Sequence, residues 1–114
     1  MDSKKFVLFF ESLIKELNYF TMELLNKNGI DDASLILNKC LEWTLPGRLG
    51  NNTFLSLRVL IYNNLGTLHT RSIDLKKAYQ YLIKAVNLCI LETHNNYKPL
   101  TFLNYSTLLF QLGE

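Results

Sequence analysis

The chain carries five long stretches in which apolar residues recur at steps of three and four, the spacing of one face of an α-helix. The first covers residues 4–27, where the apolar stripe consists of Phe6, Phe10, Leu13, Leu17, Phe20 and Leu24. The other four stretches cover residues 31–44, 53–71, 75–94 and 99–112. None of the five alternates between apolar and polar residues as a half-buried strand does. We therefore predict an all-α fold built from five helices.

The breaks between these stretches predict how the helices are connected. Two of them, Asn28-Gly29 and Ser72-Ile73-Asp74, are short, which indicates antiparallel helical hairpins. Two longer polar breaks, 46–52 and 95–99, separate one hairpin from the next element. The spacing therefore predicts stacked pairs of antiparallel helices within a single domain covering 1–114.

Composition narrows the class of protein. Hydrophobic residues make up 48% of the 114 residues and charged residues 19%, which is enough apolar material for one folded core. A net charge of +2 provides no electrostatic basis for binding nucleic acid or an anionic membrane surface. No apolar run has the length of a signal-peptide core or a membrane span. Cys40 and Cys89 lie far apart on apolar stripes, so we expect buried thiols and a cytoplasmic protein, with association with the cytoskeleton as a more specific alternative.

The titratable residues form no constellation that an enzyme or a metal site would need. His69 and His94 are the two histidines, and neither has a cysteine or carboxylate at metal-ligand spacing. Asp31 and Asp32 are adjacent carboxylates, but they begin a predicted helix, where they favour the helix dipole. We therefore predict no enzymatic activity, no cofactor and no metal site.

A pattern of large and small residues recurs along the chain. Shifted by 45 residues, the pair Leu65-Gly66 falls on Phe20-Thr21, and shifted by 40 residues in the other direction it falls on Tyr105-Ser106. A second pattern follows the small residue of the pair: another small residue 12 positions later, a large residue 16 positions later and a small residue 19 positions later. They are Ala78, Leu82 and Ala85 in the second hairpin and Ala33, Leu37 and Cys40 in the first. Small residues at these sites would let two helices approach closely.

This pattern resembles the tetratricopeptide repeat (TPR), and its long period and asparagine-rich first helix resemble the repeats of kinesin light chains and related scaffolds. The resemblance covers residues 59–92 most closely and extends to 14–44 and 99–114. It implies an α-solenoid of antiparallel helix pairs with about two and a half repeats. The repeat-like units would be 4–44, 53–94 and 99–114, with the last one incomplete, as in a fragment of a longer array.

The resemblance also implies a function, because the first helix of each TPR pair lines a concave face that binds a peptide or helix of a partner protein. The side chains expected on that face are Asn18, Tyr19, Met22, Asn63, Asn64, Thr67, Arg71, Asn104, Thr107 and Gln111. A row of asparagine amides would hold a peptide backbone, because each amide donates and accepts hydrogen bonds. An asparagine-prone composition is the alternative explanation of that row. The expected function is that of a non-catalytic adaptor or scaffold.

A second function remains open at the level of sequence. Phe6, Phe9 and Phe10 form an apolar stripe near the N-terminus that would support a homo-oligomer. The chain would then be a structural, self-associating segment of a larger cytoskeletal or multi-subunit assembly.

Overall fold

The computed structural model describes residues 3–45, 54–91 and 95–113. These residues form five helices and no strand, which confirms the all-α prediction. The helices are α1 (Ser3–Asn26), α2 (Ile30–Trp43), α3 (Leu55–Arg71), α4 (Leu75–Leu91) and α5 (Lys98–Gln111). The long break predicted at 46–52 and the predicted helical residues 53 and 92–94 lie outside the described part of the chain.

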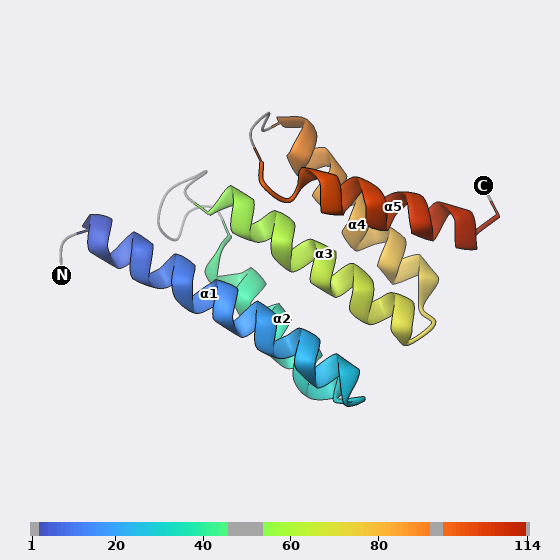
Figure 1. Ribbon diagram of the computed structural model, residues 1–114, viewed down its shortest axis with the longest axis horizontal. Coiled ribbons are helices and arrows are strands. Elements are labelled where there is room, and N and C mark those ends of the chain that lie inside the picture. The colour runs from blue at the N-terminus through green and yellow to red at the C-terminus, as the bar shows by residue number, and fades with distance from the viewer. Residues whose placement is uncertain (1–2, 46–53, 92–94, 114) are drawn as a thin grey trace.

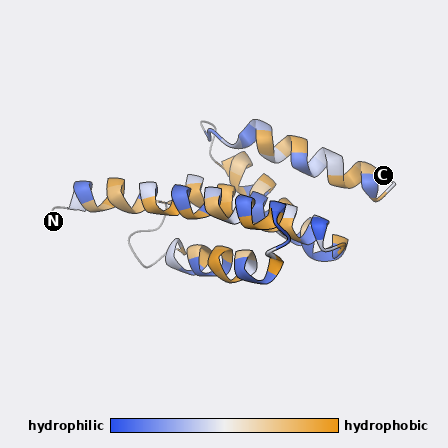
Figure 2. Cartoon of the chain, turned by 60° about the horizontal axis from the view of Figure 1, so that its bottom comes forward, coloured by the Kyte–Doolittle hydropathy of each residue, from blue (hydrophilic) through white to orange (hydrophobic). Residues whose placement is uncertain are grey.

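The helices form two layers. Figure 1 shows α1, α3 and α5 side by side in one layer, with α2 and α4 behind them. The central helix α3 contacts all four others, whereas α5 contacts α3 and α4, and α1 contacts α2 and α3. Helix α3 thus packs on both helices of the first hairpin, α1 and α2. Helix α5 packs in the same way on both helices of the second hairpin, α3 and α4. Hydrophobic and hydrophilic bands alternate along the helices, as amphipathic packing requires (Figure 2).

Helix α3 is buried on almost every side because of its central position. Each residue from Ile61 to Gly66 is buried, including two asparagines. A Cβ atom placed on Gly66 would lie 2.6 Å from Cγ of Leu82, so α3 and α4 pack without room for a side chain there. Ala78 and Ala85 of α4 are both fully buried. The close approach predicted from the small residues is therefore confirmed.

A residue with a left-handed backbone follows each of the helices α1, α3 and α5. Asn28, Ile73 and Gly113 follow one another at the repeat spacings of 45 and 40 residues, and their φ angles are 64°, 60° and 82°. In the α1–α2 and α3–α4 hairpins, the N–H of the residue after the left-handed one donates a hydrogen bond back to the preceding helix. The N–H of Gly29 donates to the carbonyl of Leu24 at 2.7 Å, and that of Asp74 donates to the carbonyl of His69 at 2.9 Å. Left-handed residues of this kind commonly terminate helices.

The turn residue Ile73 predicts a stabilising substitution. A β-branched residue in the left-handed region is strained, and the side chain is 82% exposed, so little packing offsets the strain. Asn28 shows that this turn accepts asparagine. We expect Ile73→Asn to raise the free energy of unfolding by about 1 kcal/mol, measured by urea denaturation.

Ile90→Asn is the matched control for this substitution. Ile90 is 65% exposed but lies within helix α4, where asparagine relieves no strain. We expect no gain in stability from that change. An Ile73→Asn protein no more stable than wild type would contradict the strain at this turn.

Candidate partner-binding site

Two of the cavities on the layer formed by α1, α3 and α5 lie on opposite sides of α3. The first, here the α3–α5 cavity, has a volume of about 200 Å³. Its lining residues are Thr67, Thr70, Arg71, Leu82, Asn104, Thr107, Leu108 and Gln111. The second, the α1–α3 cavity, has a volume of about 280 Å³. Its lining residues are Lys15, Asn18, Tyr19, Met22, Leu60, Asn64 and Tyr97.

The residues predicted to face a partner divide between these two cavities. Asn18, Tyr19, Met22 and Asn64 line the α1–α3 cavity, and Thr67, Arg71, Asn104, Thr107 and Gln111 line the α3–α5 cavity. Asn63 lines neither, and it is fully buried. Its predicted place on the accessible face is therefore wrong. Whether the other residues contact a partner stays a prediction.

The asparagine row joins helices to one another. Asn64 donates its Nδ2 hydrogen to Oδ1 of Asn18 at 2.7 Å, which links α3 to α1. Asn104 donates to Oδ1 of Asn63 at 3.0 Å, which links α5 to α3 in the same way. Asn63 in turn donates to Oγ1 of Thr101 at 2.7 Å. These are neutral hydrogen bonds between elements far apart in sequence, so they fix the register of neighbouring helices.

The amide of Asn63 is fully engaged within the protein, whereas that of Asn18 is engaged in part. Asn63 donates one Nδ2 hydrogen to the carbonyl of Val59 at 2.9 Å and the other to Thr101, and its oxygen accepts from Asn104. Asn18 accepts from Asn64 and donates one Nδ2 hydrogen to the carbonyl of Ile14 at 2.8 Å. The expectation that the amide of Asn63 holds a peptide is therefore wrong. The Oδ1 atom of Asn104, by contrast, accepts no hydrogen bond from the described residues.

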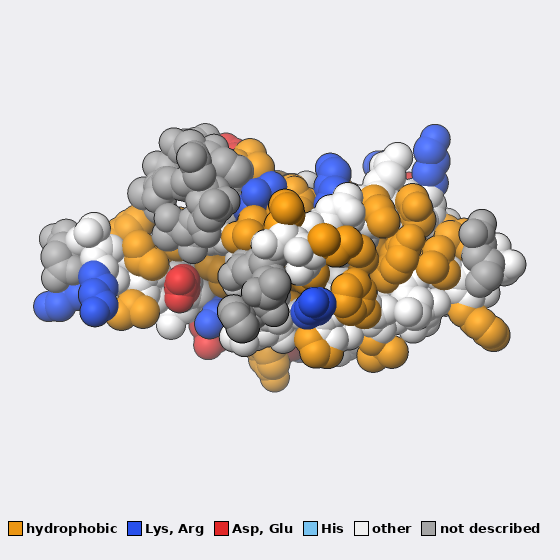
Figure 3. Space-filling view, turned by 90° about the horizontal axis from the view of Figure 1, so that it is seen from above, with side chains coloured by type: hydrophobic (Ala, Val, Ile, Leu, Met, Phe, Trp, Pro, Cys, Tyr) orange, Lys and Arg blue, Asp and Glu red, His pale blue; other side chains and the backbone are white. Residues whose placement is uncertain are grey.

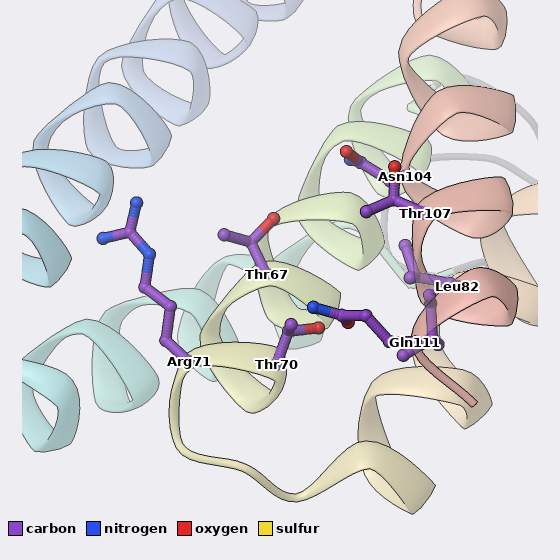
Figure 4. Close-up of a pocket in the computed structure, with 8 residues that line it drawn as sticks. Thr67, Thr70, Arg71, Leu82, Asn104, Thr107 and Gln111 are labelled. Atoms are coloured by element: carbon purple, nitrogen blue, oxygen red, sulfur yellow. The ribbon is translucent and has the colours of Figure 1, made fainter. Parts of the chain in front are cut away.

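The α3–α5 cavity is rich in hydrogen-bond acceptors. The hydroxyl groups of Thr67, Thr70 and Thr107 each donate to the carbonyl four residues earlier, at 3.1, 2.8 and 2.9 Å. Since their protons are engaged within the helices, the hydroxyl oxygens remain as acceptors. Gln111 extends from α5 toward Thr70 (Figure 4). Its amide supplies both a donor and an acceptor at that end of the cavity.

Arg71 points away from the other residues of this cavity. Figure 4 shows its guanidinium directed toward α1. There it donates to Oδ1 of Asn26 at 2.9 Å, a second side-chain link between α1 and α3 after that of Asn64 with Asn18. The contact with α1 therefore draws the guanidinium away from Asn104, although both residues line the α3–α5 cavity.

Three lining residues of the α1–α3 cavity were missed by the sequence analysis, namely Lys15, Leu60 and Tyr97. Tyr97 belongs to the polar break 95–99, yet it is half-buried and packs against the core. Its N–H donates to Oδ1 of Asn95 at 2.8 Å, and its carbonyl accepts from Oγ1 of Thr101 at 2.7 Å. The only signal was an aromatic residue within an asparagine-rich break. Leu60 was overlooked because it lies outside the main apolar stripe of its helix.

Two titratable side chains in the described part of the chain have shifted pKa values. Burial lowers the pKa of His69, with Lys77 adding to this effect and Asp74 opposing it. The His69 ring stacks on Tyr81 with 5.4 Å between the ring centroids. Burial raises the pKa of Cys40 to about 11, so its thiol stays protonated at neutral pH. Within the described ranges, no three His, Cys, Asp or Glu side chains gather to hold a metal ion. His94 lies outside those ranges.

Comparisons with protein-family models, with curated proteins and with solved structures found no significant match to this chain. None of the helices in the part of the chain described by the structure is both long enough and apolar enough to cross a membrane.

Proposed function

We propose that the chain is a non-catalytic interaction module, an adaptor or scaffold that binds a peptide segment of a partner protein across α3. The observation that supports this most directly is the pair of cavities on either side of α3, on one layer of the molecule. A single extended segment that crosses α3 would occupy both cavities.

The two cavities suit different parts of a peptide. The threonine oxygens and the Gln111 amide of the α3–α5 cavity match main-chain N–H and C=O groups. The α1–α3 cavity has an apolar and aromatic wall formed by Tyr19, Met22 and Tyr97, which suits one apolar side chain. Lys15 and Arg71 are the two charged side chains among the lining residues. Because both are cationic, we propose a partly apolar peptide without positive charge as the ligand.

The internal repetition of the structure supports a TPR-like solenoid as the framework of this site. The left-handed turns at 28, 73 and 113 recur at the repeat spacing, and so do the asparagine links between α1, α3 and α5. In such a solenoid the layer of first helices is the side on which peptides bind. Cys40 and Cys89 are both free thiols, which suits the proposed cytoplasmic location.

The proposal is tested by screening an immobilised array of synthetic peptides with the purified chain and measuring affinity for the peptides that bind. We expect Thr107→Arg, which fills the α3–α5 cavity, to weaken their binding at least ~10-fold, equivalent to about 1.4 kcal/mol. Tyr19→Ala, which removes a wall of the α1–α3 cavity, should weaken it to a similar degree, and because Tyr19 is 69% exposed the fold should not change.

Gln80→Arg provides the control, because Gln80 is exposed on α4 and lines neither cavity. It should leave peptide affinity unchanged. Peptides that bind equally well to wild type, Thr107→Arg and Tyr19→Ala would show that the binding surface lies elsewhere.

A further inference from the structure

The side of α5 that faces α3 carries polar side chains, whereas its opposite side is largely hydrophobic. Asn104, Thr107 and Gln111 all line the α3–α5 cavity. Figure 3 views α5 from above, the side away from α3 in Figure 1, and shows hydrophobic side chains gathered over α4 and α5. A ligand in the cavity therefore meets the hydrogen-bonding groups of this helix.

A chain of hydrogen bonds fixes which end of the Asn104 amide is free. The carbonyl of Val59 can only accept, so Asn63 must turn its Nδ2 group toward it, at 2.9 Å. The second Nδ2 hydrogen of Asn63 goes to Thr101, whose own proton is donated to the carbonyl of Tyr97. Oδ1 of Asn63 is then left to accept from Nδ2 of Asn104, at 3.0 Å. The orientation of the Asn104 amide is thus determined, and its Oδ1 atom accepts no hydrogen bond from the described residues.

Two threonine hydroxyl groups of α3 add acceptors to the same cavity. Thr67 and Thr70 each donate to a carbonyl of their own helix, at 3.1 and 2.8 Å, so their oxygen atoms can only accept a further bond. Figure 4 shows both oxygen atoms directed from α3 toward α5. With Oδ1 of Asn104 they form an array of acceptors in the lining of the α3–α5 cavity. A group that enters this array must bring hydrogen-bond donors.

The rest of the cavity lining favours a neutral group on an aliphatic stem. Leu82 of α4 and Leu108 of α5 are almost fully buried, and both line the cavity. They suit carbon atoms placed behind the donor group. None of the described lining residues is a carboxylate, and one of them is the cationic Arg71. An ammonium group would therefore lose its hydration here without gaining an opposite charge.

We propose that the α3–α5 cavity takes a glutamine side chain of the bound peptide. Glutamine offers two N–H donors to the acceptor array, whereas a main-chain amide offers one. Its carbonyl can accept from the amide of Gln111, and its two methylene groups can lie against Leu82 and Leu108. The cavity volume of about 200 Å³ leaves room for this side chain. The inference rests on the proposed function, because it names the side chain by which a bound peptide is selected.

Short synthetic peptides with one variable position test this selection. Each peptide carries a leucine for the α1–α3 cavity and, at varied spacing from it, glutamine, glutamate, methionine or lysine in an otherwise alanine and serine sequence. Methionine resembles glutamine in shape but has no donor, and glutamate has acceptors only. We expect the glutamine peptides to bind wild type at least ~10-fold more tightly than the other three series.

The outcomes separate this inference from the proposed function. Equal binding of all four series, or a preference for glutamate, methionine or lysine, overturns the glutamine site and leaves peptide binding across α3 standing. Failure of every peptide to bind contradicts peptide binding across α3 and the glutamine site together.

Thr67→Val tests whether the acceptor oxygens cause the selection. Valine keeps the shape of threonine without the oxygen, so affinity for the glutamine peptides should fall at least ~3-fold more than affinity for the methionine peptides. A purely structural effect would weaken both alike. Thr44→Val is the matched control, because Thr44 also donates to a carbonyl of its own helix, that of Leu41 at 3.0 Å, but lines neither cavity. An unchanged glutamine preference in Thr67→Val, or an equal loss in Thr44→Val, overturns the proposal.

Discussion

Replacing Asn63 with alanine is expected to lower the free energy of unfolding by about 3 kcal/mol. Asn63 is fully buried and joins α3 to α5 through Thr101 and Asn104. The substitution removes these two bonds and the one to the carbonyl of Val59. It also leaves the Nδ2 group of Asn104 without its acceptor, and an unsatisfied partly buried group adds to the cost.

Urea denaturation of the purified chain measures this loss. Asn38→Ala is the control, because Asn38 is exposed and donates only to the carbonyl and hydroxyl of Ser34 on its own helix. Its effect should stay within about 0.5 kcal/mol. In the double variant Asn63→Ala with Asn104→Ala, the losses should be less than additive, because the two residues share a bond. A loss below about 1 kcal/mol for Asn63→Ala would contradict the role of the asparagine link.

Gly66→Val is expected to destabilise the chain by roughly 3 kcal/mol, because it overpacks the contact between α3 and α4. A Cβ atom at position 66 would lie 2.6 Å from Cγ and 2.7 Å from Cδ2 of Leu82, which is itself only 2% exposed. Valine adds two further methyl groups beyond this Cβ atom, next to the same Leu82 side chain. The gain in helix propensity over glycine is too small to offset this.

A second substitution shows whether the clash is the cause. Leu82→Ala alone should cost about 2–5 kcal/mol through the cavity that it leaves. Combined with Gly66→Val, the valine enters that cavity, so the double variant should be more stable than the sum of the two losses predicts. Strict additivity, measured by urea denaturation, would mean that Gly66 matters for a reason other than contact with Leu82.

The number and positions of the helices could be predicted from local pattern. Apolar residues at helical spacing define each helix, and Asn28-Gly29 and Ser72-Ile73-Asp74 mark both hairpin turns. Gly66, Ala78 and Ala85 could likewise be assigned to a close helix contact from their spacing alone. These features depend on residues near one another in the chain, so local backbone and side-chain preferences are enough to indicate them.

The candidate site could be predicted only in part. The sequence pattern, through its resemblance to the TPR, indicated the side of α1, α3 and α5 on which most of the cavity-lining residues lie. It could not show that Asn18 and Asn63 pair with asparagines 46 and 41 residues away. It also could not show that Tyr97 folds back from a polar break onto the core.

The amino-acid sequence by itself determined the helices, their turns and the small residues where helices meet, since these follow from local backbone preferences and side-chain size. Only the tertiary structure decided which asparagines are structural and which cavity residues remain accessible. An amide has the same chemistry in a groove and in an interface. Its role depends on the helix that lies opposite, and the packing of α1, α3 and α5 brings that helix into place.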